Sequence, residues 1–538
     1  MSVRNGFVLL LAISGLLFLA ACGSNGNSVS IPVAPPSGNF SNSNLNGTYV
    51  FSISGTDAAN GAPYAMVGTF TANGAGGNNR GGITGGTLDI NDVVSGQAAD
   101  ASINSNSYYT VSIDGRGQAT LGTNIGNGFP NITLDFVLSS NSHGLVTEFD
   151  TFGTGSGTLD LQAAGVTPVG SYAFSFSGNN SGGSPWATTG NFTLSGTTAS
   201  GLEDFNEAGI ITYPAQSLGG SVVVSSTAPS TTLDFPNIGS LTFDVFPIDA
   251  THLKFIEMDA TATLSGDAFS QTSSTISGTM AFTLAGFEFA AGGFMVTDGA
   301  GNITSSSSED VNEAGSVVSV PSFTGSYTAA GTGRYTLGSF QNFAGGTSYA
   351  AYPSSGGLLL LEIDTAGITT GAAYPQSPTA TFAVPQGYGL NLSGYNIGNT
   401  TEVDDIAEFT TNSSGSTITG LIDENTALDG TVAFAAPFVS GTFTAPVNGR
   451  GSISTTVGNS STNTTLNGGF TLTFYVADGT TFPFVETDAN GQVATGVFVA
   501  QSSPASASAA AAQSHMFIPP PLIRAHSARQ KQKQKKTN

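Results

Sequence analysis

Cysteine is nearly absent from this chain. Cys22 is the single cysteine among 538 residues, so no intramolecular disulfide forms and no cysteine cluster is available to hold zinc. Tryptophan also occurs only once, and the chain has 4 histidines. Charged residues make up 9% of the composition, with 35 acidic side chains against 12 basic ones. These absences leave few side chains for nucleophilic or zinc-assisted catalysis.

Basic residues are scarcest in the body of the chain. Between residues 45 and 501, all 35 acidic residues are opposed only by Arg80, Arg116, Lys254, Arg334 and Arg450. A body with this charge repels nucleic acid and anionic lipid surfaces, and it attracts divalent cations. We therefore expect no nucleic-acid partner.

The N-terminal residues have the pattern of an export signal. Arg4 precedes an apolar run over 7–19, which is too short to span a bilayer comfortably and leads into Leu-Ala-Ala-Cys at 19–22. This ending resembles the lipobox of bacterial lipoproteins. The resemblance implies an exported protein that is cleaved before Cys22 and anchored to a membrane by acyl chains, such as palmitate, on that cysteine. Gly23 after the cysteine implies, by the same resemblance, the outer membrane or cell surface.

Four similar segments make up the body. Each contains an aspartate followed two residues later by an asparagine, which we call the acidic-Asn element. A Glu-x-Asp sequence follows at the end of an apolar run, and a glutamine stands fourteen or fifteen residues after the glutamate. The glutamates are Glu148, Glu257, Glu362 and Glu486, and the glutamines are Gln162, Gln271, Gln376 and Gln501. The period of about 105–125 residues is that of a domain rather than of a solenoid repeat.

Within each repeat, apolar and polar residues alternate with period two, and Gly, Asn and Asp punctuate the pattern every eight to twelve residues. This pattern predicts an all-β protein with four tandem antiparallel β-domains. Barrel and sandwich both fit the pattern, and the choice between them stays open. The expected segments are a signal peptide (1–21), a flexible tether (22–44), four repeats (45–163, 168–271, 276–376 and 380–501) and a disordered basic tail (502–538).

The acidic-Asn elements are candidate oxygen ligands for calcium. Their residues are Asp89, Asn91, Asp204, Asn206, Asp310, Asn312, Asp423 and Asn425. They lack the full spacing of an EF-hand loop, and Asp and Asn also form turns at strand ends. No other cofactor is expected.

A recurring Gly-Arg pair indicates a structural contact. Arg116, Arg334 and Arg450 each precede the glutamate of their own repeat by about thirty residues, and the second repeat has Lys254 close to its glutamate instead. We expect a latch inside each domain, which pairs Arg116 with Glu148, Lys254 with Glu257, Arg334 with Glu362 and Arg450 with Glu486. The alternative is a solvated arginine on a hairpin turn.

The Glu-x-Asp pairs allow three interpretations. On a strand, residues i and i+2 face the same side, so the two carboxylates could hold a metal ion or act as acid and base in glycoside hydrolysis. In three repeats, however, the Asp begins an Asp-x-x-Gly turn. We favour the turn.

These features favour a membrane-anchored, non-enzymatic lipoprotein with a binding, adhesion or structural role, whose partner is a glycan or a surface protein. The body is similar in composition to the Gly/Ser/Thr-rich repeat proteins of bacterial cell surfaces. The alternative is a carbohydrate-active hydrolase that uses the carboxylate pair of one repeat.

Overall fold

The computed structural model describes residues 38–75, 80–92, 94–125, 131–223, 230–273, 276–398, 400–427, 430–458, 469–489 and 491–502. The expected signal peptide, Cys22, most of the tether and the tail beyond residue 502 lie outside the described residues. None of the described helices is long and apolar enough to cross a membrane.

The first repeat closes into an antiparallel barrel. Its elements are η1 (Asn42–Asn44), β1 (Asn46–Asp57), β2 (Ala62–Asn73), β3 (Gly81–Asp92), β4 (Gly96–Ile103), β5 (Tyr108–Val111), β6 (Arg116–Gly122), β7 (Asn131–Leu138), β8 (His143–Glu148) and β9 (Gly153–Leu161). The sheet runs in chain order, and β1 pairs with both β2 and β9. Both β4 and β5 pair with β3, so together they fill one strand position and the barrel has eight positions.

The other three repeats form closed eight-stranded barrels in simple chain order. The second contains β10 (Gly170–Asn179), β11 (Pro185–Ser195), β12 (Thr198–Glu207), β13 (Ile211–Val223), β14 (Ser230–Phe235), β15 (Gly239–Asp249), β16 (His252–Glu257) and β17 (Ser265–Ser270). The third contains β18 (Gly278–Gly286), β19 (Phe289–Thr297), β20 (Asn302–Glu313), β21 (Ser316–Ala329), β22 (Tyr335–Gln341), β23 (Ser348–Ser354), β24 (Gly357–Glu362) and β25 (Thr369–Pro375). The fourth contains β26 (Gln386–Asn396), β27 (Thr401–Asn412), β28 (Thr417–Thr426), β29 (Gly430–Val447), β30 (Arg450–Val457), β31 (Thr471–Tyr475), β32 (Thr481–Glu486) and β33 (Gln492–Ala500).

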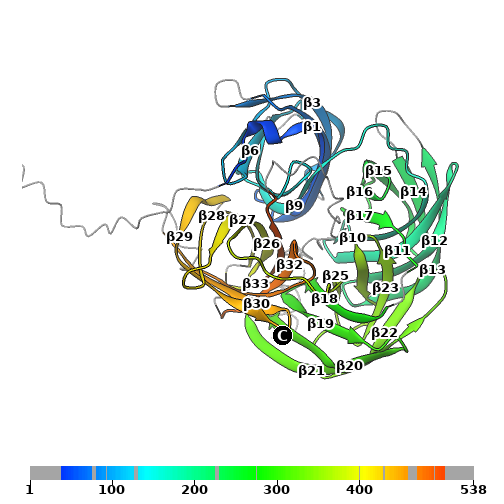
Figure 1. Cartoon of the computed structure of the whole chain (residues 1–538). Coiled ribbons are helices and arrows are strands. Elements are labelled where there is room, and N and C mark those ends of the chain that lie inside the picture. The colour runs from blue at the N-terminus through cyan, green and yellow to red at the C-terminus, as the bar shows by residue number, and fades with distance from the viewer. Residues whose placement is uncertain are drawn as a thin grey trace, which may run out of the picture. The chain divides into compact units, whose positions relative to one another are not determined.

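The predicted all-β class with four antiparallel domains is confirmed, and the domains are barrels (Figure 1). Closure leaves no free sheet edge in a domain whose strands are joined by short hairpins. The period-two alternation in the sequence follows from this architecture, because one side chain faces the barrel interior and the next faces outward.

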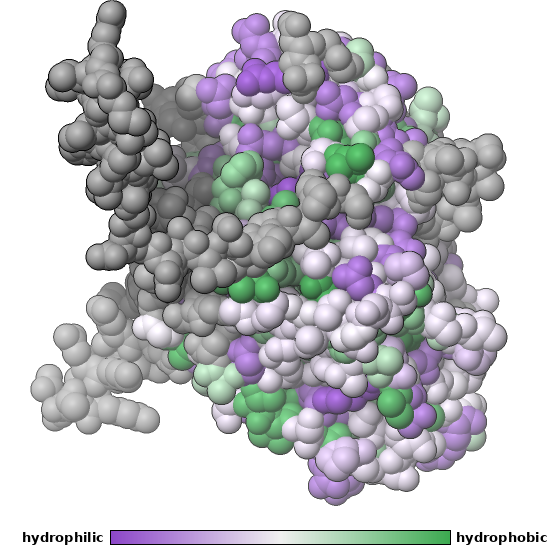
Figure 2. Space-filling model, turned by 60° about the vertical axis from the view of Figure 1, so that its left-hand side comes forward, coloured by the Kyte–Doolittle hydropathy of each residue, from purple (hydrophilic) through white to green (hydrophobic). Residues whose placement is uncertain are grey.

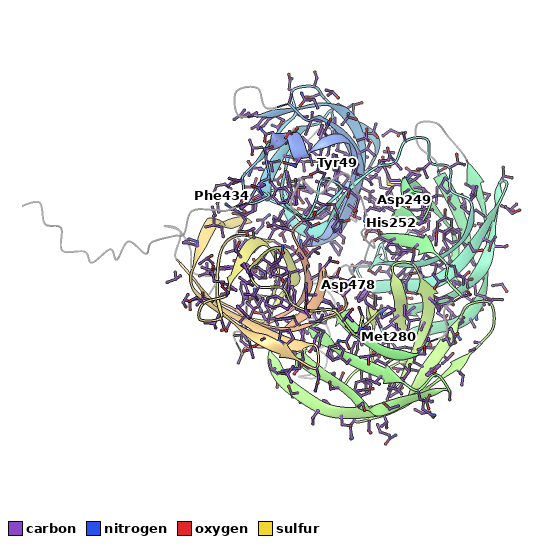
Figure 3. The ribbon with its side chains drawn as sticks, in the orientation of Figure 1. Tyr49, Asp249, His252, Met280, Phe434 and Asp478 are labelled. Carbon is purple, nitrogen blue, oxygen red and sulfur yellow. The ribbon has the colours of Figure 1, made fainter. Side chains whose placement is uncertain are left out.

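Aromatic side chains fill each barrel. In the fourth barrel, Phe498 packs against Phe482 and Phe474 with ring centroids 4.9 and 5.0 Å away. The first strand of the first barrel carries Tyr49, whose hydroxyl donates to the carbonyl of Asn141 at 2.6 Å. Tyr172 and Tyr388 make similar hydroxyl bonds to backbone carbonyls in the second and fourth barrels, and Met280 stands at this position in the third (Figure 3).

A truncation inside one barrel tests this core. Ile53→Ala in β1 should cost about 2–5 kcal/mol in the free energy of unfolding, because Ile53 is 1% exposed and its removal leaves a cavity. Ile113→Ala, at a side chain of the same barrel that is 48% exposed, is the matched control and should cost much less. Urea denaturation followed by circular dichroism measures both changes, and equal effects would contradict the assigned interior.

Candidate functional site

The asparagines of the four acidic-Asn elements lie at contacts between barrels. Asn206 of the second barrel donates its side-chain amide to the carbonyls of Glu362, at 2.8 Å, and Gly367, at 2.9 Å, in the third barrel. Asn312 of the third barrel donates in the same way to the carbonyl of Glu486 in the fourth, at 3.1 Å. We call these residues the interface asparagines.

The remaining two interface asparagines complete the series. Asn91 of the first barrel donates to the carbonyl of Glu257 in the second at 2.6 Å. Asn425 of the fourth barrel donates to the carbonyls of Glu148, at 2.8 Å, and Gly153, at 2.7 Å, in the first. The contacts therefore run from each barrel to the next in chain order and return from the fourth to the first.

Charged pairs accompany two of these contacts. Arg334 of the third barrel donates two hydrogen bonds to Asp204 of the second, at 2.7 and 2.6 Å, and the Tyr352 hydroxyl donates a third at 2.6 Å. Arg450 of the fourth barrel donates two to Asp310 of the third, both at 2.7 Å. Such two-pronged guanidinium–carboxylate bonds are among the strongest polar contacts in proteins.

The arginines thus pair with a different carboxylate from the expected one. In the described parts of the chain, no ion pair joins an arginine to the glutamate of its own repeat. The reason is geometric: Arg334 faces outward to the neighbouring barrel, whereas Glu362 lies inside its own barrel beside Thr369. Lys254 also pairs elsewhere, with Asp267 of its own barrel at 2.8 Å.

The other two interfaces carry different charges at the corresponding place. Arg116 lies 3.7 Å from Asp423 of the fourth barrel and is held by Asp114 of its own barrel at 3.1 Å. Between the first and second barrels, where the second repeat has no arginine, Asp89 faces Asp244 instead. Burial, together with the nearby Asp244 carboxyl, raises the pKa of Asp89 to about 7.

The four recurrent glutamates are buried, and three of them, Glu148, Glu257 and Glu362, are largely neutral near pH 7. Burial is the main cause that raises the pKa of Glu257 to about 10 and that of Glu362 to about 8, and it raises the pKa of Glu148 well above its usual range. Inside the first barrel, Glu148 accepts a hydrogen bond from the hydroxyl of Tyr64. Glu148, Glu257 and Glu362 therefore serve as neutral hydrogen-bonding groups near the ends of their barrels.

The aspartates of the Glu-x-Asp pairs form turns. Each strand ends at its glutamate, and in the first three repeats the carboxyl group of the aspartate that follows lies within hydrogen-bonding reach of the glutamate carboxyl. Asp150 accepts the backbone N–H of Phe152 and of Thr133, both at 2.8 Å, and Asp364 accepts that of Ala366 at 2.7 Å. These are Asx-type turn bonds, and they support the turn interpretation.

Among the described residues, no three His, Cys, Asp or Glu side chains are grouped so that they could hold a metal ion. Asp204 and Asp310 are engaged by arginines, and the interface asparagines direct their amide nitrogens at carbonyls. Calcium binding by the acidic-Asn elements stays a prediction.

A cavity of about 340 Å³ lies at one end of the third barrel, beside the second. Its wall includes Glu362, Phe289 and Thr369 of the third barrel and Pro185 of the second. It combines apolar surface with a buried carboxyl group, which is the composition expected of a small-molecule site. Nothing in the sequence pattern had indicated a cavity at this place.

Sequence reasoning also gave no role to the recurrent glutamines. Each donates its side-chain amide to a backbone carbonyl of the following barrel, or of the first barrel in the case of Gln501. The bonds are Gln162 to Pro247 (2.7 Å), Gln271 to Thr332 (3.3 Å), Gln376 to Val476 (3.0 Å) and Gln501 to Asp114 (2.7 Å). The nearly constant separation in sequence between each glutamine and its glutamate was the signal that could have indicated this structural role.

Comparisons with known proteins show only distant likenesses. No family model matches the chain, and no curated protein does. Eighteen chains of solved structures match. One is the isotype 1 transferrin binding protein B of serogroup B Neisseria meningitidis, with 11% identity and a TM-score of 0.20 over 67% of this chain and 84% of that one. Another is a mutant transferrin binding protein B of Haemophilus parasuis, with 8% identity and a TM-score of 0.19 over 68% and 82%. Likenesses at such low TM-scores support no functional inference.

The Arg334–Asp204 pair can be tested by a double-mutant cycle. Arg334→Ala should cost about 3–5 kcal/mol in the free energy of unfolding, because it leaves the buried Asp204 carboxylate uncompensated. Asp204→Asn in the same chain should recover part of the loss. Arg80→Ala is the control, since the exposed Arg80 only stacks over Tyr108. Urea unfolding measures Arg334→Ala, Asp204→Asn, the double variant and the control. If Arg334→Ala costs the same stability with and without Asp204→Asn, the pair does not couple the barrels.

The neutral glutamates predict greater stability in mild acid. The pKa of Glu362 is raised to about 8 in the folded protein, so between about pH 4.5 and 8 the folded state binds more protons than the unfolded state. Stability should therefore fall as pH rises through this window, and Glu362→Gln should reduce the slope by up to about 1.4 kcal/mol per pH unit. Gln341→Ala, at an exposed uncharged side chain of the same barrel, should leave the slope unchanged. Thermal and urea unfolding at a series of pH values measures the slopes, and equal slopes for wild type and Glu362→Gln would contradict a neutral Glu362.

Proposed function

We propose that this chain is an exported lipoprotein, anchored to the cell envelope through lipid on Cys22, whose four barrels form a non-catalytic binding or structural body at the cell surface. Its partner is a glycan or a surface protein. The outer membrane is the proposed location, as the lipobox-like N-terminus and Gly23 imply.

The observation that carries this proposal is the use of the recurrent polar residues. Interface asparagines, arginines and glutamines all connect one barrel to another. The asparagine and the glutamine recur in all four repeats and the arginine in three of them, and at this place they serve assembly of the body rather than four copies of a reaction. These recurrent residues therefore hold the four barrels together as one body.

The carboxyl groups also argue against hydrolysis. Retaining and inverting glycosidases need one ionised carboxylate beside a protonated one, on two sides of the scissile bond. Here the glutamate of each pair lies buried inside a barrel, and the aspartate that follows accepts hydrogen bonds from backbone N–H groups in all four repeats. Neither member of the pair presents a free catalytic carboxylate.

The visible surface suits polar partners. Figure 2 shows a face on which hydrophobic residues occur in small groups among neutral and hydrophilic ones. Exposed large apolar side chains come from separate elements, among them Val94, Ile210, Val318 and Val447. A glycan, which binds mainly through hydrogen bonds and ring stacking, is compatible with such a surface, and the acidic body disfavours nucleic acid.

The anchor and the lack of catalysis can be tested together. In bacteria fed labelled palmitate, the wild-type chain should take up label and sediment with membranes, whereas Cys22→Ala should lose the label and leave the membrane fraction. Ser24→Ala, two residues away, is the matched control and should behave as wild type. The purified protein should release no reducing ends from a panel of polysaccharides.

Label that persists in Cys22→Ala would overturn the lipid anchor. Release of reducing ends that Glu148→Gln, Glu257→Gln, Glu362→Gln or Glu486→Gln abolishes would overturn the non-catalytic role and favour the hydrolase.

A further inference from the structure

One end of each barrel is built from the same two positions. The first is the recurrent glutamate that ends the seventh strand position. The second position lies on the second strand, opposite a glycine of the first strand. From the first barrel to the fourth, its residues are Tyr64, Trp186, Phe289 and Val403. Each of these four residues also lies opposite the residue after the interface asparagine. The four residues therefore occupy equivalent positions in the four barrels.

The first and third barrels differ at this end in two aromatic positions: Phe289 replaces Tyr64, and Ala366, four residues after Glu362, replaces Phe152, four residues after Glu148. In the first barrel, the Tyr64 hydroxyl bonds to the Glu148 carboxyl, and Phe152 packs edge-on against Tyr64 with ring centroids 5.4 Å apart. In the third barrel, Phe289 has no hydroxyl to offer Glu362. The cavity of about 340 Å³ lies at this place, with Phe289 and Glu362 in its wall.

Two glycines pack closely against the Glu362 carboxyl, which is buried at the cavity wall. A Cβ on Gly346 would lie 2.3 Å from Oε1 of Glu362, and one on Gly367 would lie 3.3 Å from Oε2. Both glycines line the cavity. Any side chain at Gly346 would clash with the Glu362 carboxyl, so glycine at this position lets the buried carboxyl stay where it lines the cavity.

The carboxyl is also held in position. Thr369 donates to Oε2 of Glu362 at 3.1 Å, and the Thr369 hydroxyl lies 3.0 Å from that of Tyr349. From the second barrel, Asn206 ties down the carbonyls of Glu362 and Gly367 on both sides of the turn between them. A positioned polar group beside an aromatic ring is a preorganised site.

The lining selects against charged anions and large ligands. Glu313 stands at the wall with Glu362, and none of the described lining residues is basic. The volume is at the lower end of the range of about 300–1,000 Å³ for small-molecule sites. Phe289 and Ile368 supply apolar surface. A neutral ring that carries hydroxyl groups satisfies all of these features.

We propose that this cavity, the Glu362 pocket, binds one unit of a neutral saccharide, with the sugar ring against Phe289 and a sugar hydroxyl at Glu362 in the place that the Tyr64 hydroxyl takes in the first barrel. This inference rests on the proposed function as a glycan-binding body and names its site. The ligand is either a free monosaccharide or the terminal unit of a glycan chain.

The full chain, extracted in a detergent without a sugar headgroup, is titrated with glucose, galactose, N-acetylglucosamine and glucuronate by calorimetry. Fluorescence of the single tryptophan, Trp186, gives a second readout, because it is the neighbour in sequence of Pro185 in the pocket wall. At least one neutral sugar should bind saturably, and glucuronate should bind more weakly. A matching oligosaccharide that binds more tightly than its monosaccharide indicates a glycan end, and equal affinities indicate a free sugar.

Phe289→Tyr supplies the missing hydroxyl and should weaken sugar binding about tenfold or more, with a melting temperature equal to or above that of wild type. Tyr64→Phe, the reverse exchange in the first barrel, should leave the affinity unchanged. If Phe289→Tyr does not fold, Ala366→Trp at the exposed pocket wall serves instead, with Ala300→Trp in an exposed turn of the same barrel as control.

Absence of saturable binding by all three neutral sugars overturns the pocket assignment, and so does binding that Phe289→Tyr or Ala366→Trp leaves intact. Neither result affects palmitate labelling of Cys22 or the polysaccharide assay. Failure of the pocket is therefore distinguishable from failure of the proposed function.

Discussion

The body depends on one kind of contact, in which an asparagine side-chain amide donates hydrogen bonds to backbone carbonyls of a turn in a neighbouring barrel. The strand that carries each recurrent glutamate ends there, and its last carbonyl needs a hydrogen-bond donor. Asn425 supplies two N–H groups, which reach the carbonyls of Glu148 and Gly153 on either side of one turn. A buried carbonyl without a donor costs about 1–3 kcal/mol, so turn and asparagine are stable only together. The same solution recurs at all four interfaces.

The four interfaces share this geometry but differ in charge. Arg334 and Arg450 make two-pronged bonds to aspartates of the preceding barrels, while Arg116 stays at 3.7 Å from Asp423. At the junction of the first and second barrels, two acidic groups meet instead. The hydrogen bonds to backbone carbonyls are therefore common to all four interfaces, whereas the charged pairs differ from one interface to the next.

The four barrels share a fold, but the side chains at one end of the barrel differ between repeats. The glutamate at the barrel end is retained in every repeat, but its surroundings change from the Tyr64 hydroxyl in the first barrel to a lined cavity in the third. Phe289 stands where the first barrel has Tyr64, and Ala366, four residues after Glu362, stands where the first barrel has Phe152, four residues after Glu148. The interface asparagines allow no such variation, because each must satisfy two backbone groups.

The sequence by itself determined the β class, the four-fold repetition and which polar residues matter, because a barrel interior imposes period-two alternation and turns need Asp, Asn and Gly. It did not decide barrel against sandwich, since both show the same alternation. It also did not show which carboxylate Arg334 meets: Glu362 of its own repeat is close in sequence but faces inward, and Asp204 comes from another barrel. Only tertiary structure decided those partners and the cavity beside Glu362, because both depend on which barrels touch and with which face.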